Sequence, residues 1–330
     1  MAAAARVAPK DYFSPVEWAP LSQKSTWRGV ALIVHAWAVI LAAAAMTMVW
    51  PITLPLAVML IGARQLGLAI LMHDAAHSAL HPNRRINDWV GDNLTPGGLV
   101  QYRTYHLGHH KYAQQGEDPD LGLSSPFPIT RQSLRRKIIR DLTGQTHFKQ
   151  RWAPFFKRLA HPQPGESRLG IVGRFVTNRW RFFAGAAVTI AVTAPFGFWW
   201  AWFALWWLPQ ATWYPMITRL RNIAEHACVA KDEPDPLRHA RTTRANWLER
   251  AFIAPYYVNY HCEHHMFMHV PCYSLPRAHR LLKAKGVLPG MLTAPSYLDV
   301  LRQASSKPIG EDRDGNPTPE ARGVVRTSIQ

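Results

Sequence analysis

Long stretches without formal charge are the feature that most constrains the fold of this chain. Residues 29–50 contain no Asp, Glu, Lys or Arg, and as a helix they would be roughly 33 Å long, enough to cross a bilayer core. A second apolar stretch, 52–72, follows at once and is interrupted only by Arg64. Because an arginine is costly inside a membrane, this helix must face protein or water at Arg64, or its membrane limits are shifted. A cleaved signal peptide is the alternative for 29–50, but its apolar core would be shorter, at roughly 7–15 residues.

A third uncharged stretch, 182–218, would be about 55 Å long as one helix and is too long for a single span. Pro195 and Gly197 predict a reversal, because proline and glycine interrupt helices. We therefore expect two further spans, at about 180–197 and 198–218. The many tryptophans in this stretch are typical of anchors at a membrane interface rather than of a binding site. They are Trp199, Trp200, Trp202, Trp206, Trp207 and Trp213.

These stretches predict an all-α integral membrane protein with four transmembrane helices in two hairpins. The segment between the hairpins and the residues after the last span would form a helical cytoplasmic cap. We expect one membrane domain over 26–303. The flanking residues, 1–25 and 304–330, lack apolar periodicity and are predicted to be mobile tails.

The charge distribution predicts which side of the membrane carries the cap. The chain has 38 Lys and Arg against 21 Asp and Glu, and its net charge is +17. Basic residues gather in 131–158, whereas the two predicted hairpin turns are uncharged. By the positive-inside rule, this predicts a multi-pass protein of the cell inner membrane with both termini and the cap, together with any site it carries, in the cytoplasm. A nucleic-acid surface would also explain the charge, but the sequence contains no nucleic-acid-binding motif, so no nucleic-acid partner is expected.

Histidines recur at the spacing of metal ligands. HDAAH contains His73 and His77 after the second apolar stretch, and two HxxHH boxes follow it along the chain. These are HLGHH, with His106, His109 and His110, and HCEHH, with His261, His264 and His265. Because positions i, i+3 and i+4 share one face of a helix, each box could aim its imidazoles at one place. Neutral imidazole is the commonest side-chain metal ligand, and eight of them exceed the needs of one ion. The pattern predicts a histidine-rich site for two metal ions, without choosing the metal.

With these boxes the sequence resembles the membrane fatty-acid desaturase and hydroxylase superfamily, whose signature is HxxxH, HxxHH and HxxHH on four spans. The resemblance covers about residues 30–285. It includes HDAAHSALHPNRRINDWVGD, YHLGHHKYAQQGEDPDLGL, RNIAEHA and NYHCEHHMFMHVPCYSLP, which look like bacterial acyl-desaturase sequence. The resemblance implies two non-haem iron ions as cofactors and O2 as co-substrate, with two external electrons, for removing two hydrogens from an unactivated alkyl chain.

The resemblance also implies a ninth histidine ligand shortly after the fourth span, which falls on His226. One helical turn before it, Asn222 matches an asparagine that contacts one iron through water in this superfamily, and the i, i+4 spacing puts both on one helix face. A ligating imidazole normally gives its other N–H to an oxygen, so acidic neighbours are expected to orient the ligands. These are Asp74, Glu263, Glu225, Asp118 and Asp120. His81, His269 and His279 lie off the box patterns and are not expected to be ligands.

The predicted function is that of an O2-dependent di-iron desaturase that introduces a double bond into a lipid acyl chain. A carotenoid or lipid hydroxylase or ketolase of the same superfamily is the first alternative, because its first box looks similar. A zinc-dependent membrane hydrolase and a non-enzymatic lipid-binding protein are the others. The sequence has no haem-binding HPGG segment and no cysteine spacing for an iron–sulfur cluster. We therefore expect a separate electron donor, a ferredoxin or cytochrome b5 type with its reductase, which the basic stretch 131–158 could help to dock.

Overall fold

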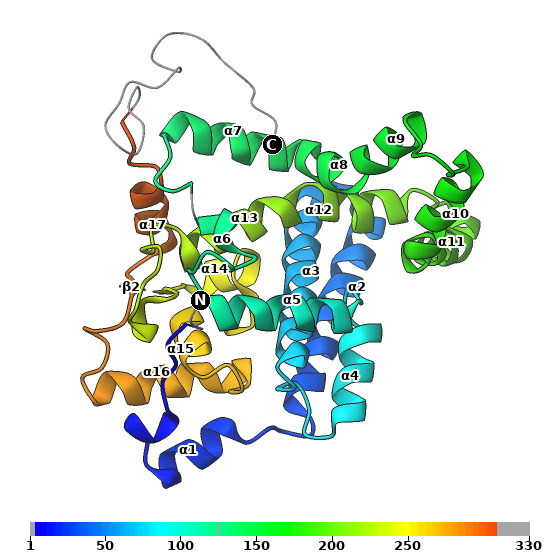
Figure 1. The fold of residues 1–330 in the computed structure, drawn as a ribbon. Coiled ribbons are helices and arrows are strands. Elements are labelled where there is room, and N and C mark those ends of the chain that lie inside the picture. Colours follow the sequence, from blue (N-terminus) through cyan, green and yellow to red (C-terminus); the bar gives the residue numbers. More distant parts are fainter. Residues whose placement is uncertain (1–3, 125, 309–330) are drawn as a thin grey trace.

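The computed structural model describes residues 4–124 and 126–308, and helices dominate it (Figure 1). The α-helices are α1 (Pro15–Ser22), α2 (Arg28–Val49), α3 (Leu54–Ala76), α4 (Arg84–Asn93), α5 (Leu99–Tyr112), α6 (Leu121–Ser124), α7 (Arg131–Leu142), α8 (Gln145–Arg151), α9 (Ala153–Ala160), α10 (Arg168–Asn178), α11 (Trp180–Thr193), α12 (Leu208–Ala211), α13 (Trp213–His226), α14 (Trp247–Phe252), α15 (His261–Met266), α16 (Leu275–Ala284) and α17 (Tyr297–Ala304). Short helices of other types are η1 (Pro9–Asp11), η2 (Pro51–Thr53), η3 (Ala194–Phe196), the π-helix η4 (Phe203–Trp207), η5 (Pro236–Arg238), η6 (Pro255–Tyr257) and η7 (Cys272–Ser274). In the described part of the chain the strands are β1 (Thr242–Thr243) and β2 (Thr293–Ala294), which pair in parallel. The predicted helical class is confirmed.

The first two predicted spans are helices that pack against each other as a hairpin, α2 and α3. Helix α2 buries one stripe of small and branched residues at intervals of three or four: Gly29, Ile33, Ala36, Ile40, Ala43 and Thr47. Its opposite face exposes apolar side chains, including Val34, Leu41 and Val49. Within the described residues, Arg28–Val49 and Pro51–Ala76 are the two helices long and apolar enough to cross a membrane.

Arg64, in the middle of α3, is buried inside the protein. Its Nη2 donates to the carbonyl oxygens of Ala251 at 2.7 Å and Arg250 at 3.4 Å, in the last turn of α14. The guanidinium carbon also lies 5.4 Å from the centre of the Tyr256 ring. Carbonyls in the last turn of a helix lack partners within that helix, so Arg64 satisfies them. The helix therefore faces protein at Arg64, which was one of the two arrangements that the sequence left open.

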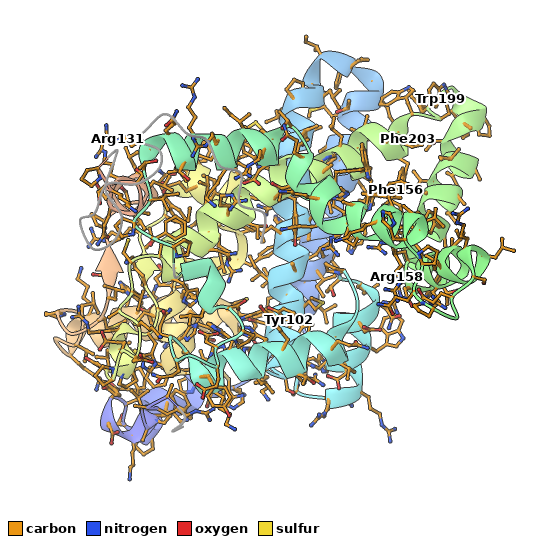
Figure 2. All side chains as sticks on the ribbon, turned by 45° about the horizontal axis from the view of Figure 1, so that its top comes forward. Tyr102, Arg131, Phe156, Arg158, Trp199 and Phe203 are labelled. Atoms are coloured by element: carbon orange, nitrogen blue, oxygen red, sulfur yellow. The ribbon has the colours of Figure 1, made fainter. Side chains whose placement is uncertain are left out.

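The third apolar stretch does not form two uninterrupted helices. Helix α11 and η3 end at Gly197, whose φ of +83° closes the turn predicted at Pro195–Gly197. The following residues are divided among η4, α12 and α13, with Pro209 and Pro215 inside the last two. Gln65 of α3 donates to the Trp206 carbonyl at 2.9 Å, which fixes this broken segment against α3. Trp199 and Phe203 lie at the outer edge of the molecule (Figure 2). The predicted span 180–197 corresponds to the shorter apolar helix Trp180–Phe196, whereas 198–218 is divided among several short helices, so the two further spans stay a prediction.

Part of the predicted N-terminal tail is folded. Helix α1 begins with a capping box, in which Ser14 and Glu17 bond each other's backbone N–H groups. Leu21 of this helix is fully buried, and Phe13 packs on Phe267 with ring centres 5.2 Å apart. At the other end, α17 extends to Ala304, and most of the predicted C-terminal tail, 309–330, lies outside the described residues.

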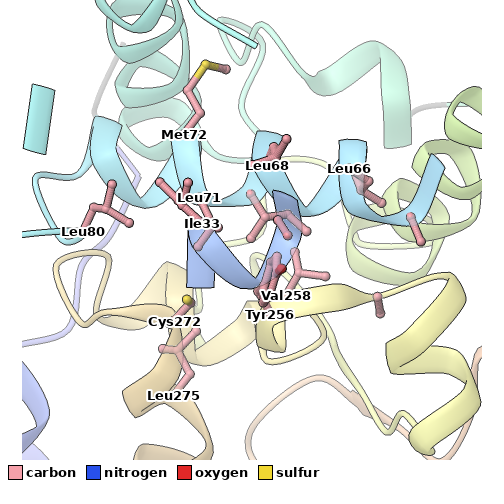
Figure 3. Close-up of a cluster of buried hydrophobic side chains, with 14 of the residues drawn as sticks. Ile33, Leu66, Leu68, Leu71, Met72, Leu80, Tyr256, Val258, Cys272 and Leu275 are labelled. Carbon is pink, nitrogen blue, oxygen red and sulfur yellow. The ribbon is translucent and has the colours of Figure 1, made fainter. Parts of the chain in front are cut away.

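The apolar core joins the α2–α3 hairpin to the C-terminal third of the chain. The cluster in Figure 3 contains Leu66, Leu68 and Leu71 of α3 together with residues from the C-terminal third, among them Tyr256, Val258, Cys272 and Leu275. Helix α4 packs on the end of α3 at Gly91, where a Cβ atom would lie only 2.4 Å from the Cβ of Ala75. Residues that are distant in the sequence are thereby held around the end of α3.

A row of helices, α7 to α9, carries the basic stretch along one edge of the molecule, with Arg131 and Arg158 at its two ends (Figure 2). Asp141 of α7 accepts two hydrogen bonds from the Arg219 guanidinium of α13, at 2.5 and 2.9 Å. This ion pair, between a buried Asp141 and a partly buried Arg219, connects the row to the helix that ends in His226.

Candidate metal centre

The nine predicted histidine ligands lie at the ends of four helices. His73 lies in the last turn of α3 and His77 caps that helix. The second box occupies the last turns of α5, the third forms most of α15, and His226 is the last residue of α13. Eight of these side chains are buried, and His265 is partly buried. The fold therefore gathers nine imidazoles in one region with little access to water.

The imidazoles divide into two groups. The ligand atoms of the first group all lie within 4.8 Å of one another, and this group comprises His73, His77, His106, His110 and His264. In the second group, the ligand atoms of His109, His226 and His265 lie within 4.8 Å of one another. The ligand atoms of His226, His261 and Glu225 also lie within 4.8 Å of one another. Neighbouring histidines of one box belong to different groups, because successive residues of a helix point about 100° apart. His109 and His110 are separated in this way on α5, as are His264 and His265 on α15.

Nitrogen atoms converge within each group. His110 Nε2 lies 3.0 Å from both His106 Nε2 and His264 Nε2. In the second group, His261 Nε2 lies 2.9 Å from His226 Nε2 and 3.2 Å from His265 Nε2, and His265 Nε2 is 3.3 Å from His109 Nε2. A ring nitrogen can share one proton with one neighbour, so a cluster of this kind leaves lone pairs facing one another.

Unpaired nitrogen atoms test whether metal ions fit these groups. Within the described residues, His73 Nε2 and both ring nitrogens of His77 are buried and make no hydrogen bond. Leaving a buried polar atom without a partner costs about 1–3 kcal/mol. Sets of five and four imidazoles suit zinc, copper, iron or nickel, and a metal ion would satisfy the free lone pairs. The residues present therefore fit two metal ions.

Burial lowers the pKa of several of the predicted histidine ligands. It lowers the pKa of His77, His106 and His110 well below the ordinary histidine value, and the charge of neighbouring histidines lowers it further. The same causes lower the pKa of His226, His261, His264 and His265. Neutral imidazole is the form that binds metal, so the site is prepared for ions at neutral pH.

One predicted partner, Asp118, lies against the outer nitrogen of a ligand. Its Oδ1 is 2.7 Å from His109 Nδ1, and its carboxylate also accepts the backbone N–H groups of Gln114 and Asp120. Asp120 lies farther away, at 3.8 Å from His109 Nδ1, and it accepts a hydrogen bond from the Tyr105 hydroxyl. The loop after the second box thus orients His109 so that its Nε2 points into the second group.

The acidic residues inside the first and third boxes have other partners. Asp74 Oδ2 accepts the Cys272 backbone N–H at 2.9 Å, and its other oxygen is 3.7 Å from His73 Nδ1. Glu263 accepts from the Thr242 hydroxyl and lies 2.5 Å from His279 Nδ1. These two carboxylates connect the boxes to the surrounding chain, and within the described residues the Glu263 carboxylate forms no hydrogen bond with a box histidine.

On α13, the carboxylate of Glu225 contacts one of the predicted ligands. Glu225 Oε1 accepts from Arg221 Nε at 2.7 Å, and Oε2 lies 3.3 Å from His261 Nε2. Burial raises the pKa of Glu225 to about 7, although Arg221 acts in the opposite direction. Asn222 is partly buried one turn before His226, and among the described contacts its side chain has no hydrogen bond to a box histidine.

The sequence interpretation missed three residues at this centre. Gln114 Nε2 lies 3.4 Å from His226 Nδ1 and 3.3 Å from the His239 carbonyl oxygen. The Tyr102 ring stacks on the His106 ring, with centres 5.4 Å apart and planes within 4°. Arg221 stands four residues before Glu225, and this spacing is the sequence signal that could have identified it.

Comparison with known proteins agrees with this geometry. The family model described as "Fatty acid desaturase" matches residues 48–292, a range that contains all nine histidines. The chain is also 28% identical over 241 residues to the dihydrorhizobitoxine desaturase of Bradyrhizobium elkanii. The matched region covers 69% of this chain and 67% of that protein. The chain belongs to the fatty acid desaturase family.

Proposed function

We propose that this protein is a di-iron, O2-dependent desaturase that introduces a double bond into a lipid acyl chain. The observation that carries the proposal is the division of nine buried imidazoles into two groups within the region that matches the family. His73, His77, His106, His110 and His264 would hold one iron ion. His109, His226, His261 and His265 would hold the other.

The reaction requires two electrons from outside the chain. Two hydrogens leave adjacent carbons of the substrate, O2 is reduced to two water molecules, and a donor supplies two electrons and two protons. Bound iron ions would supply the oxidising power needed to break unactivated C–H bonds with O2. The protein's own residues hold the ligands in fixed directions, through Asp118 at His109, and exclude water by burying the imidazoles.

A position in the membrane is part of the proposal. The outer face of α2 is apolar, as expected for a surface in contact with lipid. Arg181, at the start of α11, donates to the Asp92 carbonyl at 2.6 Å and to its carboxylate at 3.0 Å. This contact brings the start of the second hairpin next to the end of α4, and it supports two hairpins that enter from the same side. We infer a multi-pass protein of the inner membrane with four spans, the second pair formed by broken helices, and with its termini and metal centre on the cytoplasmic side.

The electron donor is proposed to be a separate ferredoxin or b5-type protein with its reductase. Of the three cysteines, Cys262 and Cys272 are buried and Cys228 is partly buried, and they show no spacing for an iron–sulfur cluster. Iron-loaded protein given O2 and substrate should therefore complete at most about one turnover. Addition of a donor with its reductase should restore continued turnover, and steady turnover without any reductant would contradict the proposed reaction.

The substrate is tested by the products. The relative from B. elkanii is named for dihydrorhizobitoxine rather than for a fatty acid, so a lipid acyl substrate needs its own experiment. We expect mass spectrometry of lipids from cells that express the chain to reveal new acyl double bonds, and cells that express His264→Ala to lack them. Hydroxylated or ketonic lipids or pigments would assign the chain to hydroxylation or ketolation instead. One zinc ion per chain in place of two irons would favour a hydrolase.

A further inference from the structure

We propose that Glu225 is itself a ligand of the second metal ion, through Oε2, rather than a partner that only orients a histidine. The inference rests on the proposed two-metal site. It adds a carboxylate to the four imidazoles of the second group, which then offers five ligands, as the first group does.

The position of Glu225 relative to the two nitrogens of an imidazole distinguishes the two roles. A carboxylate that orients a ligand lies at the nitrogen that faces away from the ion, as Asp118 does at His109 Nδ1. The nitrogen of His261 that faces the ion is Nε2, since it lies 2.9 Å from His226 Nε2 and 3.2 Å from His265 Nε2. Glu225 Oε2 lies 3.3 Å from this same inner nitrogen. Its oxygen is therefore directed at the point where the imidazole lone pairs meet.

Among the described contacts, only one of the two carboxylate oxygens of Glu225 accepts a hydrogen bond. Arg221 donates to Oε1 at 2.7 Å, and the two residues are one turn apart on α13. Glu225 Oε2 is buried and makes no hydrogen bond within the described residues. A buried carboxylate oxygen is costly without a partner, and a cation beside the nitrogens would provide one. Ligation by Oε2 explains both the fixed orientation and the unsatisfied atom.

The test compares iron retention and Mössbauer spectra of the full-length protein loaded with ⁵⁷Fe. The wild type is expected to hold two irons and to show two unlike quadrupole doublets, because one ion has five imidazoles and the other has a carboxylate. Glu225→Gln keeps the size of the side chain but weakens its donor oxygen. On dialysis against a chelator, we expect this variant to lose one iron and the doublet of that iron, while the other doublet stays unchanged.

Two variants serve as matched controls. Asp141→Asn neutralises another buried carboxylate that is paired with an arginine of α13, Arg219, and we expect it to keep both irons. Asp118→Asn removes a partner of the outer nitrogen of His109, and such changes typically weaken metal binding about 10–100-fold. Glu225→Gln should lose more iron than Asp118→Asn. If Glu225→Gln does not fold, Glu225→Asp should fold and displace the oxygen, and it should then alter one doublet only.

Each outcome distinguishes the ligand role from the proposed function. A wild type with two irons and a Glu225→Gln variant with equal retention and unchanged doublets would overturn the ligand role and leave the di-iron site intact. If Glu225→Gln loses no more iron than Asp118→Asn, the ligand role is also overturned. Glu225 would then be a positioning residue. A wild type that binds no iron, or one ion, would contradict the di-iron proposal itself.

Discussion

At the scale of single residues, the centre is a set of imidazoles whose inner nitrogens face one another. Such a set is more stable with bound ions than without them, because each ion satisfies several lone pairs at once. The contribution of one histidine is therefore larger than that of one hydrogen bond. His264 illustrates this, since its Nε2 lies 3.0 Å from that of His110 and its ring is 4.3 Å from that of His73.

We predict that His264→Ala lowers bound iron and abolishes desaturation. The change removes a ligand from the first group and leaves the remaining imidazoles with an incomplete coordination shell. Iron content and product formation in purified protein measure the effect. His161→Ala, at an exposed histidine between α9 and α10, is the matched control and should keep both properties. Full activity of His264→Ala in a protein with normal iron would refute the assignment of this ligand.

Histidine spacing predicted eight of the imidazoles that the structure brings together, and the family resemblance added His226, but neither predicted how they divide into two groups. Positions i, i+3 and i+4 share a helix face, and this is why whole boxes could be recognised. Which members of α5 and α15 point to which ion depends on the rotation of each helix in the fold. The place of Glu225 was also beyond prediction, because the sequence contains no information about which nitrogen of His261 faces it. Asn222 as a water-mediated contact stays a prediction.

At the scale of elements, α3 and α14 depend on one buried arginine. Helix α14 is only six residues long, and the carbonyls of its last turn meet the Arg64 guanidinium instead of water. The contact also holds the residues before the third box against the helix that carries the first box. Arg64 therefore contributes to the relative positions of two boxes without touching either.

We predict that Arg64→Leu destabilises the protein by about 1–3 kcal/mol, because it leaves buried carbonyl oxygens without a donor. Thermal unfolding in detergent, followed with and without iron, measures the loss. Arg84→Leu removes an arginine whose side chain is 74% exposed, and it should change the unfolding temperature little. Equal unfolding temperatures for the wild type and Arg64→Leu would show that this contact does not stabilise the hairpin.

The helices that could be predicted are those with the simplest physical signal. Uncharged length identified α2 and α3 to within a few residues. The same criterion was too coarse for 182–218, where proline residues and crossings with α3 divide the chain into short helices. Helix α1 was predicted as a mobile tail, although Ser14, Pro15 and Glu17 provide the residues of a capping box. Its stability comes from burial of Phe13 and Leu21 on residues far along the chain, which local sequence does not reveal.

At the scale of the whole molecule, the proposed topology can be tested with single cysteines. Ile52, in the turn of the first hairpin, and Val16, before the first span, are 88% and 84% exposed, so they form a matched pair. In a Cys228→Ser background, we expect a membrane-impermeant maleimide to label Ile52→Cys in spheroplasts from the outside. Val16→Cys should be labelled only after the membrane is opened. Phe196→Cys, in the turn of the second hairpin, should behave like Ile52→Cys.

Labelling at Phe196 decides between four spans and two. If Phe196→Cys is inaccessible from outside while Ile52→Cys is labelled, only the first hairpin crosses the membrane. Labelling of Val16→Cys from the outside would reverse the whole orientation and place the metal centre on the wrong side for a cytoplasmic electron donor.

The buried arginine of α3 also has a consequence for the order of synthesis. The acceptor of its shorter hydrogen bond, Ala251, is 187 residues farther along the chain. At about 5–20 residues per second, a ribosome needs roughly 10–40 s to make that residue after Arg64. During this interval a newly inserted hairpin carries an arginine without its partner, at a cost of about 2.5–3.5 kcal/mol near the centre of a span. Helix α3 therefore reaches its final environment only after translation has passed α14, and a chain terminated before Trp247 would leave the Arg64 guanidinium without these acceptors.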